Sequence, residues 1–288
     1  MIHAMLAIAR ALAVALAGFA LGGITAPAGA AGATGATPAA DAARAQAAAA
    51  AASSAPGHPD YGREARWADE VAPTVMVGDV VWLRTPDRER VLALYTKASG
   101  PLRGGVVIVH GLGVQPDFGI IGELRADLAA RGFATLSVQM PVLAADALPG
   151  EYDALFPIAG DRIEAGVQWL AANGVAPVAV VAHSLGAAMA NRWLGRPQHA
   201  GVGAFVAIGM SVPWAAAQLP PVLDVTAEHD LPAVLANAPL RALALPKARC
   251  SATLRIDGAN HFLDGHGGEL ADAIAAFLAR AFGADCRR

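Results

Sequence analysis

The sequence predicts an α/β fold built on a mostly parallel sheet of about eight strands, with helices on both faces. From Val75 onward, apolar runs of strand length alternate with segments of helical periodicity. Runs such as GGVVIVHG are continuously apolar, which is typical of parallel strands buried on both faces. Two predicted helices close on glycine, at Gly132 and Gly174, a residue favoured just past a helix C-terminus.

The elements follow in order along the chain. An antiparallel hairpin is predicted at residues 75–85 and 90–98, joined by the polar turn PDRE. Further strands are predicted at 104–111, 133–141, 178–184, 203–210, 221–230 and 252–262. Helices are predicted at 120–132, 162–174, 185–195, 231–245 and 269–282.

Two connections bear on access to a site. Residues 142–158 form the longest irregular stretch predicted within the domain, and we expect them to form a rim near the carboxyl ends of the strands. The connection at residues 211–220 is short. About ten residues cannot hold a further domain, so no large cap is expected at this connection.

The first 30 residues have the features of a secretory signal peptide. Arg10 precedes an apolar stretch, Ala11 to Ile24, and Ala28-Gly29-Ala30 supplies small residues for cleavage. A helix over the apolar stretch would rise roughly 21 Å, less than the roughly 30 Å hydrocarbon core. Secretion or periplasmic export is therefore expected, with an uncleaved membrane anchor as the alternative.

Composition divides the rest of the chain and excludes several classes of protein. Residues 31–58 are rich in Ala, Gly and Pro and predict a flexible linker, which leaves 59–288 as the folded α/β domain. Charged residues make up 16% and the net charge is −3, so no electrostatic footprint for nucleic acid is present. Two cysteines and no C-x-x-C pattern predict neither a metal site nor a cofactor.

Three residues at predicted strand ends suggest nucleophilic catalysis. Ser184, in AHSLG, lies between a strand and a helix, with Ala182 and Gly186 supplying the small side chains that a sharp turn needs. Asp230 ends the penultimate strand and His261 ends the last one. The order serine, acid, histidine is that of α/β-hydrolases, with imidazole as base and carboxylate as its orienting partner. A serine that only caps the helix is the alternative.

On these motifs, VVIVHGLG, AHSLG, PVLDVTAEHD and GANHF, the chain from about residue 75 to 282 resembles the α/β-hydrolase superfamily. It is most similar to dienelactone-hydrolase-like proteins and to uncharacterised secreted bacterial α/β-hydrolases. The resemblance implies Ser184 as nucleophile, Asp230 as acid and His261 as base. Ala182 replaces the usual glycine. Dienelactone hydrolases use cysteine where this chain has serine, which argues against a dienelactone substrate.

Two backbone N–H groups are expected to form an oxyanion hole. Leu185 follows the nucleophile at a helix N-terminus and supplies one donor. The resemblance places the other at Leu112, in the Gly111-Leu112-Gly113 loop. We expect His110 to orient that loop through hydrogen bonds to backbone rather than to exchange protons.

Other polar residues near the strand ends have competing interpretations. His229 is a rival base, and Glu228 and Asp224 are rival acids, although Asp224 lies inside its strand and favours a structural hydrogen bond. We interpret His183 as packing. Surface or core positions are expected for the remaining candidates, which are Asp117, Glu123, Trp169, Trp193, Asp264 and His266.

The predicted function is a serine hydrolase that cleaves a carboxylic ester or related acyl bond of a small molecule. The alternative is a catalytically silent protein of the same fold that only binds its ligand. Esterase and peptidase activity are not distinguished by these residues. Cys250 precedes the last strand and Cys286 follows the last helix, so a disulfide between them is an open possibility in an oxidising compartment.

Overall fold

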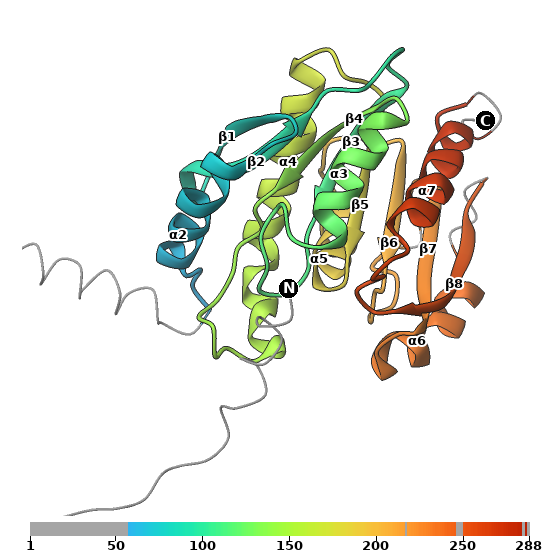
Figure 1. Ribbon diagram of the computed structural model, residues 1–288. Helices are drawn as coiled ribbons and strands as arrows, with labels where there is room; N and C mark the ends of the chain where they lie inside the picture. Colours follow the sequence, from blue (N-terminus) through green and yellow to red (C-terminus); the bar gives the residue numbers. More distant parts are fainter. Residues whose placement is uncertain (1–56, 217, 246–249, 284–285, 287–288) are drawn as a thin grey trace, which may run out of the picture. The chain divides into compact units, whose positions relative to one another are not determined.

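The computed structural model describes residues 57–216, 218–245, 250–283 and 286. Its centre is an eight-stranded sheet in the order β1-β2-β4-β3-β5-β6-β7-β8 (Figure 1). β1 and β2 form an antiparallel hairpin, β2 is antiparallel to β4, and the remaining neighbours pair in parallel. The predicted α/β architecture of about eight mostly parallel strands is confirmed.

The elements have the following bounds. The strands are β1 (Asp79–Thr85), β2 (Arg88–Thr96), β3 (Gly104–Val109), β4 (Phe133–Val138), β5 (Val178–His183), β6 (Ala204–Ile208), β7 (Val222–His229) and β8 (Ala252–Asn260). The helices are α2 (Tyr61–Val71), α3 (Ile120–Ala130), α4 (Phe156–Ala172), α5 (Leu185–Leu194), α6 (Pro232–Leu243) and α7 (Gly267–Ala281), with short 3₁₀ turns η1 (Ala72–Thr74) and η2 (Pro149–Leu155).

Helices bury both faces of the sheet. In β3, Val106 and Ile108 pack into the core under α3 and α7, while Val107 and Val109 pack into the core under α4 and α5 (Figure 1). All six residues of β3 are buried. Because successive side chains of a strand point to opposite faces, a strand covered on both sides needs a continuous apolar run. This explains the pattern that predicted the fold.

The parallel strands place several polar residues at one edge of the sheet. β3, β5, β7 and β8 run in the same direction, and the residues that directly follow them are His110, Ser184, Asp230 and His261. Ligands of open α/β sheets bind at this carboxyl edge. The fold therefore brings distant parts of the chain to a common site.

Helix α2 precedes the hairpin and was not predicted from the sequence. Asp60 caps it by accepting a hydrogen bond from the backbone N–H of Arg63 at 2.8 Å. The buried face of α2 consists of Glu64, Ala68 and Val71. Helical periodicity is recognised by apolar residues, and here a carboxylate occupies one of the buried positions.

Helix α4 begins at Phe156, earlier than the predicted residue 162. Only residues 142–148 of the predicted irregular stretch lack helical structure, because η2 and the first turn of α4 occupy the rest. Pro149 and Pro157 lie in the first turns of these two elements. Proline lacks an N–H and has a helical φ, so it is well suited to the start of a helix.

No large cap covers the carboxyl edge between β6 and β7. Residues 209–216 and 218–221, which make up the described part of this connection, form neither helix nor strand. This agrees with the prediction from its length.

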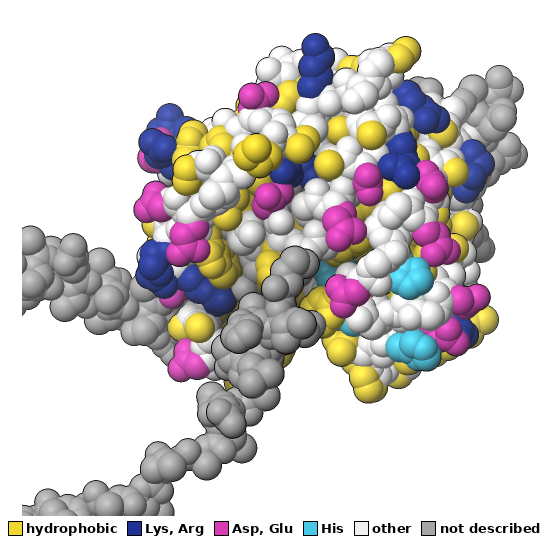
Figure 2. Space-filling model, viewed as in Figure 1, with side chains coloured by type: hydrophobic (Ala, Val, Ile, Leu, Met, Phe, Trp, Pro, Cys, Tyr) yellow, Lys and Arg dark blue, Asp and Glu magenta, His cyan; other side chains and the backbone are white. Residues whose placement is uncertain are grey.

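The predicted signal peptide, residues 1–30, lies outside the described residues, as does the predicted linker up to residue 56. In the part of the chain that is described, no helix combines the length and apolar character that crossing a bilayer requires. On the face drawn in Figure 2, acidic and basic side chains are interspersed rather than gathered by sign.

Cys250 and Cys286 form a disulfide, with their Cα atoms 5.9 Å apart. Cys250 lies just before β8 and Cys286 just after α7. Since α7 runs back along the strand that precedes it, the far end of the helix returns to the start of β8. The bond ties the last strand–helix unit of the fold together.

Candidate active site

Ser184 occupies a strained turn between β5 and α5. Its backbone has φ 56° and ψ −124°, a region that side chains other than glycine rarely adopt. Gly186 makes the turn possible, because a Cβ there would lie 2.2 Å from the carbonyl oxygen of His110. The backbone N–H of Ser184 donates to Ile208 O at 2.7 Å, which fixes the turn against β6.

The structure brings the three predicted side chains into one hydrogen-bonded chain. His261 Nε2 lies 2.9 Å from Ser184 Oγ, and His261 Nδ1 lies 2.5 Å from Asp230 Oδ1. The imidazole can thus accept the serine proton at one nitrogen while the carboxylate holds the proton on the other. Asp230 and His261 are buried, so water competes little for these bonds.

The environment keeps Asp230 ionised. Burial alone would raise the pKa of this carboxyl group, but hydrogen bonds from His261 and from the backbone N–H groups of Ala227 and Leu231 outweigh it and lower the pKa below its usual value. An ionised carboxylate accepts the Nδ1–H of His261. With Nδ1 held by the carboxylate, the other ring nitrogen, Nε2, is directed at the serine hydroxyl.

Two further residues hold His261 in place, and the sequence interpretation gave neither this role. His183 Nε2 donates to the backbone carbonyl of His261 at 2.8 Å, and burial lowers the pKa of His183 to about 4, so it stays neutral. Gly209 has φ 60°, and a Cβ there would lie 3.1 Å from His261 Cε1. A glycine directly after β6 was the available signal for this close approach.

His110 fixes the loop that follows β3. Its Nδ1–H donates to Gly111 O at 2.9 Å, and its Nε2 accepts from the backbone N–H of Met140 at 2.8 Å. Burial lowers the pKa of His110 to about 4. The ring is neutral and fully engaged with backbone, as its predicted orienting role requires.

The loop held by His110 runs close to the serine. A Cβ on Gly111 would lie 3.1 Å from Ser184 Cβ, a tight contact that glycine avoids. Leu112, the predicted oxyanion donor, follows in the loop. Leu185 begins α5, where the first backbone N–H groups have no partner within the helix.

The rival candidates lie elsewhere. Asp224 is buried in β7 and forms an ion pair with Arg241 at 2.9 Å, which agrees with its expected structural role. Glu228 pairs with Arg255 at the surface, and His229 is exposed. Residues expected at the surface or in the core occupy such positions: Asp117 pairs with Arg125, Asp264 is exposed, His266 faces Glu269, Trp193 is buried and Trp169 packs against the core.

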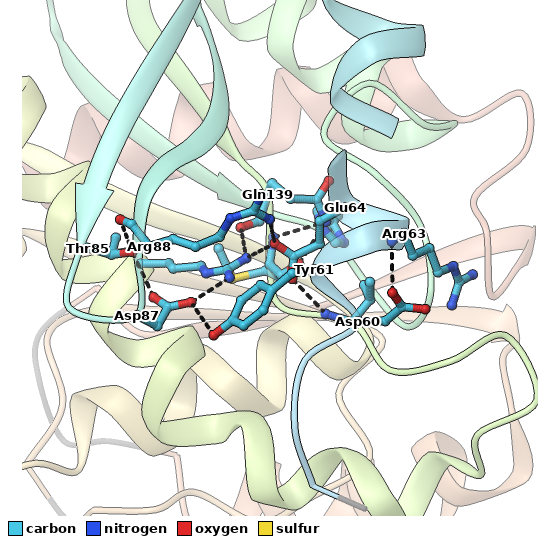
Figure 3. Close-up of polar contacts among 12 residues, drawn as sticks. Asp60, Tyr61, Arg63, Glu64, Thr85, Asp87, Arg88 and Gln139 are labelled. Carbon is cyan, nitrogen blue, oxygen red and sulfur yellow. Dashed lines mark hydrogen bonds and ion pairs between the residues drawn. The ribbon is translucent and has the colours of Figure 1, made fainter. Parts of the chain in front are cut away.

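A second polar cluster joins α2 to the sheet (Figure 3). Glu64 pairs with Arg88 of β2 at 2.9 Å and with the fully buried Arg162 of α4 at 3.0 Å, and Arg162 also pairs with Asp87 at 2.7 Å. A pocket of about 330 Å³ opens beside this cluster. Its lining residues are Glu64, Ala65, Ala68, Asp69, Trp82, Arg88, Arg90, Leu92 and Gln139. These belong to α2, β1 and β2, with Gln139 directly after β4, and none of Ser184, Asp230 and His261 lines the pocket.

Within the described residues, no three His, Cys, Asp or Glu side chains are grouped in a way that would hold a metal ion.

Sequence comparison finds one family that matches part of the chain. A family described as a protein of unknown function, DUF3530, matches residues 20–160, a region that ends before Ser184. Among curated proteins, no sequence matches the chain significantly.

Solved structures resemble most of the domain at low sequence identity. An α/β serine hydrolase homologue from Coxiella burnetii has a TM-score of 0.54 at 15% identity, covering 73% of this chain and 99% of its own. A dienelactone hydrolase from Anabaena variabilis has a TM-score of 0.53 at 21% identity, covering 70% and 95%. An α/β serine hydrolase without a lid from Xanthomonas campestris has a TM-score of 0.51 at 14% identity, covering 72% and 95%.

Proposed function

From the α/β-hydrolase fold of this chain, we propose that it is a serine hydrolase that cleaves a carboxylic ester or related acyl bond. One observation carries the proposal: Ser184, His261 and Asp230 are linked by hydrogen bonds of 2.9 and 2.5 Å at the carboxyl edge of the sheet. The strained backbone of Ser184 supports the same conclusion, because strain of this kind collects at functional sites.

The reaction begins with acylation of the serine. His261 Nε2 takes the proton from Ser184 Oγ as the oxygen attacks the substrate carbonyl carbon. The carbonyl oxygen becomes an oxyanion and accepts hydrogen bonds from the N–H groups of Leu185 and Leu112. The intermediate then collapses, the bond to the leaving oxygen breaks, and the imidazolium protonates the departing alkoxide.

Deacylation repeats these steps with water. The imidazole takes a proton from water, the resulting hydroxide attacks the acyl-enzyme, and Ser184 leaves with the proton returned by His261. Asp230 stays ionised throughout and stabilises the imidazolium that forms twice in each cycle. No cofactor takes part in this scheme.

The surroundings of the serine support an apolar acyl group on an accessible substrate. Leu112 belongs to the proposed oxyanion loop, and Leu231 and Phe262 directly follow Asp230 and His261 in sequence; all three side chains are substantially exposed. No large cap covers them. Exposed apolar side chains next to site residues favour an apolar ligand.

We place the protein outside the cytoplasm, in the periplasm or secreted. Its leader-like first 30 residues support this location, as does the disulfide between Cys250 and Cys286, because such bonds persist in oxidising compartments. The mass of the protein recovered from the medium, the periplasm and the membrane fraction tests it. Recovery in the membrane fraction with a mass that retains the leader would favour the membrane-anchored alternative.

A fluorophosphonate probe tests the nucleophile. The wild type should be labelled and Ser184→Ala should not, whereas Ser99→Ala should be labelled like the wild type. Ser99 is an exposed serine after the antiparallel strand β2, and serves as the matched control. Equal labelling of wild type and Ser184→Ala would refute the proposal. An unlabelled wild type that turns over no ester would favour the alternative, a silent binding protein.

A further inference from the structure

Arg63 of α2 joins two loops at the carboxyl edge of the sheet. Its Nη2–H donates to the carbonyl oxygen of Gly113 at 3.0 Å, and its Nη1–H donates to that of Leu143 at 2.9 Å. The first loop follows β3 and the second follows β4, the neighbouring strand. A single planar guanidinium thus fixes the spacing between them.

The first of these loops contains the proposed oxyanion donor. Leu112 lies between two anchored carbonyl groups: His110 holds Gly111 O at 2.9 Å, and Arg63 holds Gly113 O. Gly113 has φ 66°, and its backbone is otherwise free to change conformation. The hydrogen bond from Arg63 restricts the conformation of the loop on the side that His110 does not reach.

The second loop is also fixed to α2. Val142 O accepts a hydrogen bond from the backbone N–H of Asp60 at 2.7 Å, and the N–H of Leu143 donates to Tyr152 Oη at 3.2 Å. These bonds hold the carbonyl group of Leu143 in place. Because Arg63 donates to both carbonyl oxygens, it also restrains the position of Gly113.

Helix α2 provides a rigid base for Arg63. Figure 3 shows Glu64 directed into the buried polar cluster, while the side chain of Arg63 leaves the helix in another direction. Glu64 pairs with Arg162 at 3.0 Å, and Arg162 donates to Gln139 O at 3.2 Å. Removing one partner of a buried ion pair is strongly destabilising, so this cluster holds α2 firmly against the sheet.

We propose that Arg63 is a positioning residue for the oxyanion hole, and that α2 serves as the strut that carries it. The inference rests on the proposed function, because it assigns a catalytic consequence to the Leu112 N–H. Oxyanion donors stabilise the transition state only when they are preorganised, and a shift of about 1 Å can cost roughly 10²-fold in rate.

Three variants test the proposal in the full-length protein: Arg63→Gln, Arg63→Lys and the control Arg66→Gln. Arg66 is exposed on the same helix. With a short nitrophenyl ester, Arg63→Gln should lower kcat by roughly 10- to 100-fold and change KM by no more than about twofold. Arg63→Lys retains a donor and should recover part of the loss. Arg66→Gln should match the wild type.

Hydrogen exchange measured by mass spectrometry provides a readout independent of turnover. Peptides spanning residues 110–118 should exchange faster in Arg63→Gln than in Arg66→Gln, while peptides from β5 should be unchanged.

The outcomes separate the two claims. The inference is overturned if Arg63→Gln has the kcat of Arg66→Gln, if only KM rises, or if exchange in the loop is unaltered. Faster loop exchange with no turnover in any variant, wild type included, would instead refute the proposed function while supporting the anchoring by Arg63.

Discussion

Replacing Gly209 with alanine should disable the site by displacing His261. Gly209 follows β6 with φ 60°, and a Cβ there would lie 3.1 Å from His261 Cε1, 3.2 Å from its Nδ1 and 3.6 Å from Asp230 Oδ2. The added methyl group would therefore press on the edge of the imidazole that faces Asp230.

The size of the effect follows from these distances. Carbon atoms in contact prefer a separation of about 3.5–4.0 Å, so the ring must move by about 0.5 Å. The hydrogen bond from His183 restrains the backbone of His261, so the ring must tilt rather than retreat. Since a displacement of about 1 Å can cost roughly 10²-fold, we expect kcat to fall by about 10-fold or more.

The same substitution has a cost in stability that must be separated from its effect on catalysis. Alanine in the left-handed region costs about 1–2 kcal/mol, which corresponds to a fall in Tm of roughly 2–8 °C. Gly174→Ala is the matched control: Gly174 has φ 75°, and a Cβ there would meet nothing within 4 Å. It should lose similar stability and keep full activity.

The assay is hydrolysis of a nitrophenyl ester at a temperature where both variants are folded, together with thermal unfolding. Equal kcat values for Gly209→Ala and Gly174→Ala would refute the reasoning. A selective loss in Gly209→Ala would show that the space at Gly209 is needed by the imidazole.

Two further predictions concern stability. Burial lowers the pKa of His110 and of His183 from 6.5 to about 4, so the stability linked to these neutral rings is complete above pH 6.5 and is lost as the pH falls through about 4. Each ring should contribute about 3 kcal/mol to the free energy of unfolding over that pH range. Urea unfolding at a series of pH values measures this change. A free energy of unfolding that stays constant between pH 6.5 and 4 would contradict the prediction. Replacing both Cys250 and Cys286 with serine removes a disulfide that joins residues 36 apart in the sequence. The free energy of unfolding should fall by about 3–4 kcal/mol, while kcat should stay the same. Unchanged urea unfolding would count against the disulfide.

The sequence was most informative where one physical demand determines each residue. A strand covered on both faces must be apolar throughout, so runs such as the one in β3 predicted the sheet. In α2, by contrast, Glu64 occupies a buried position because Arg162 and Arg88 neutralise it. That compensation depends on distant segments, and no local pattern reveals it.

The same distinction applies to the site. Ser184, Asp230 and His261 could be predicted to lie close together because each directly follows a strand, and parallel strands end at one edge of a sheet. Arg63 gave no such signal, since its partners lie 50 and 80 residues away and are backbone carbonyls, which every residue possesses. Contacts of this kind become apparent only in three dimensions.

The proposed acyl-enzyme is tested most directly by rapid mixing of the wild type with a nitrophenyl ester, followed by mass analysis of the quenched protein. If Ser184 is the nucleophile, nitrophenolate should appear in a burst of about one equivalent per active chain, and the acyl group should be recovered on the peptide that contains Ser184. Turnover of the ester by Ser184→Ala at the rate of the wild type, or an acyl group recovered only on another residue, would contradict the account.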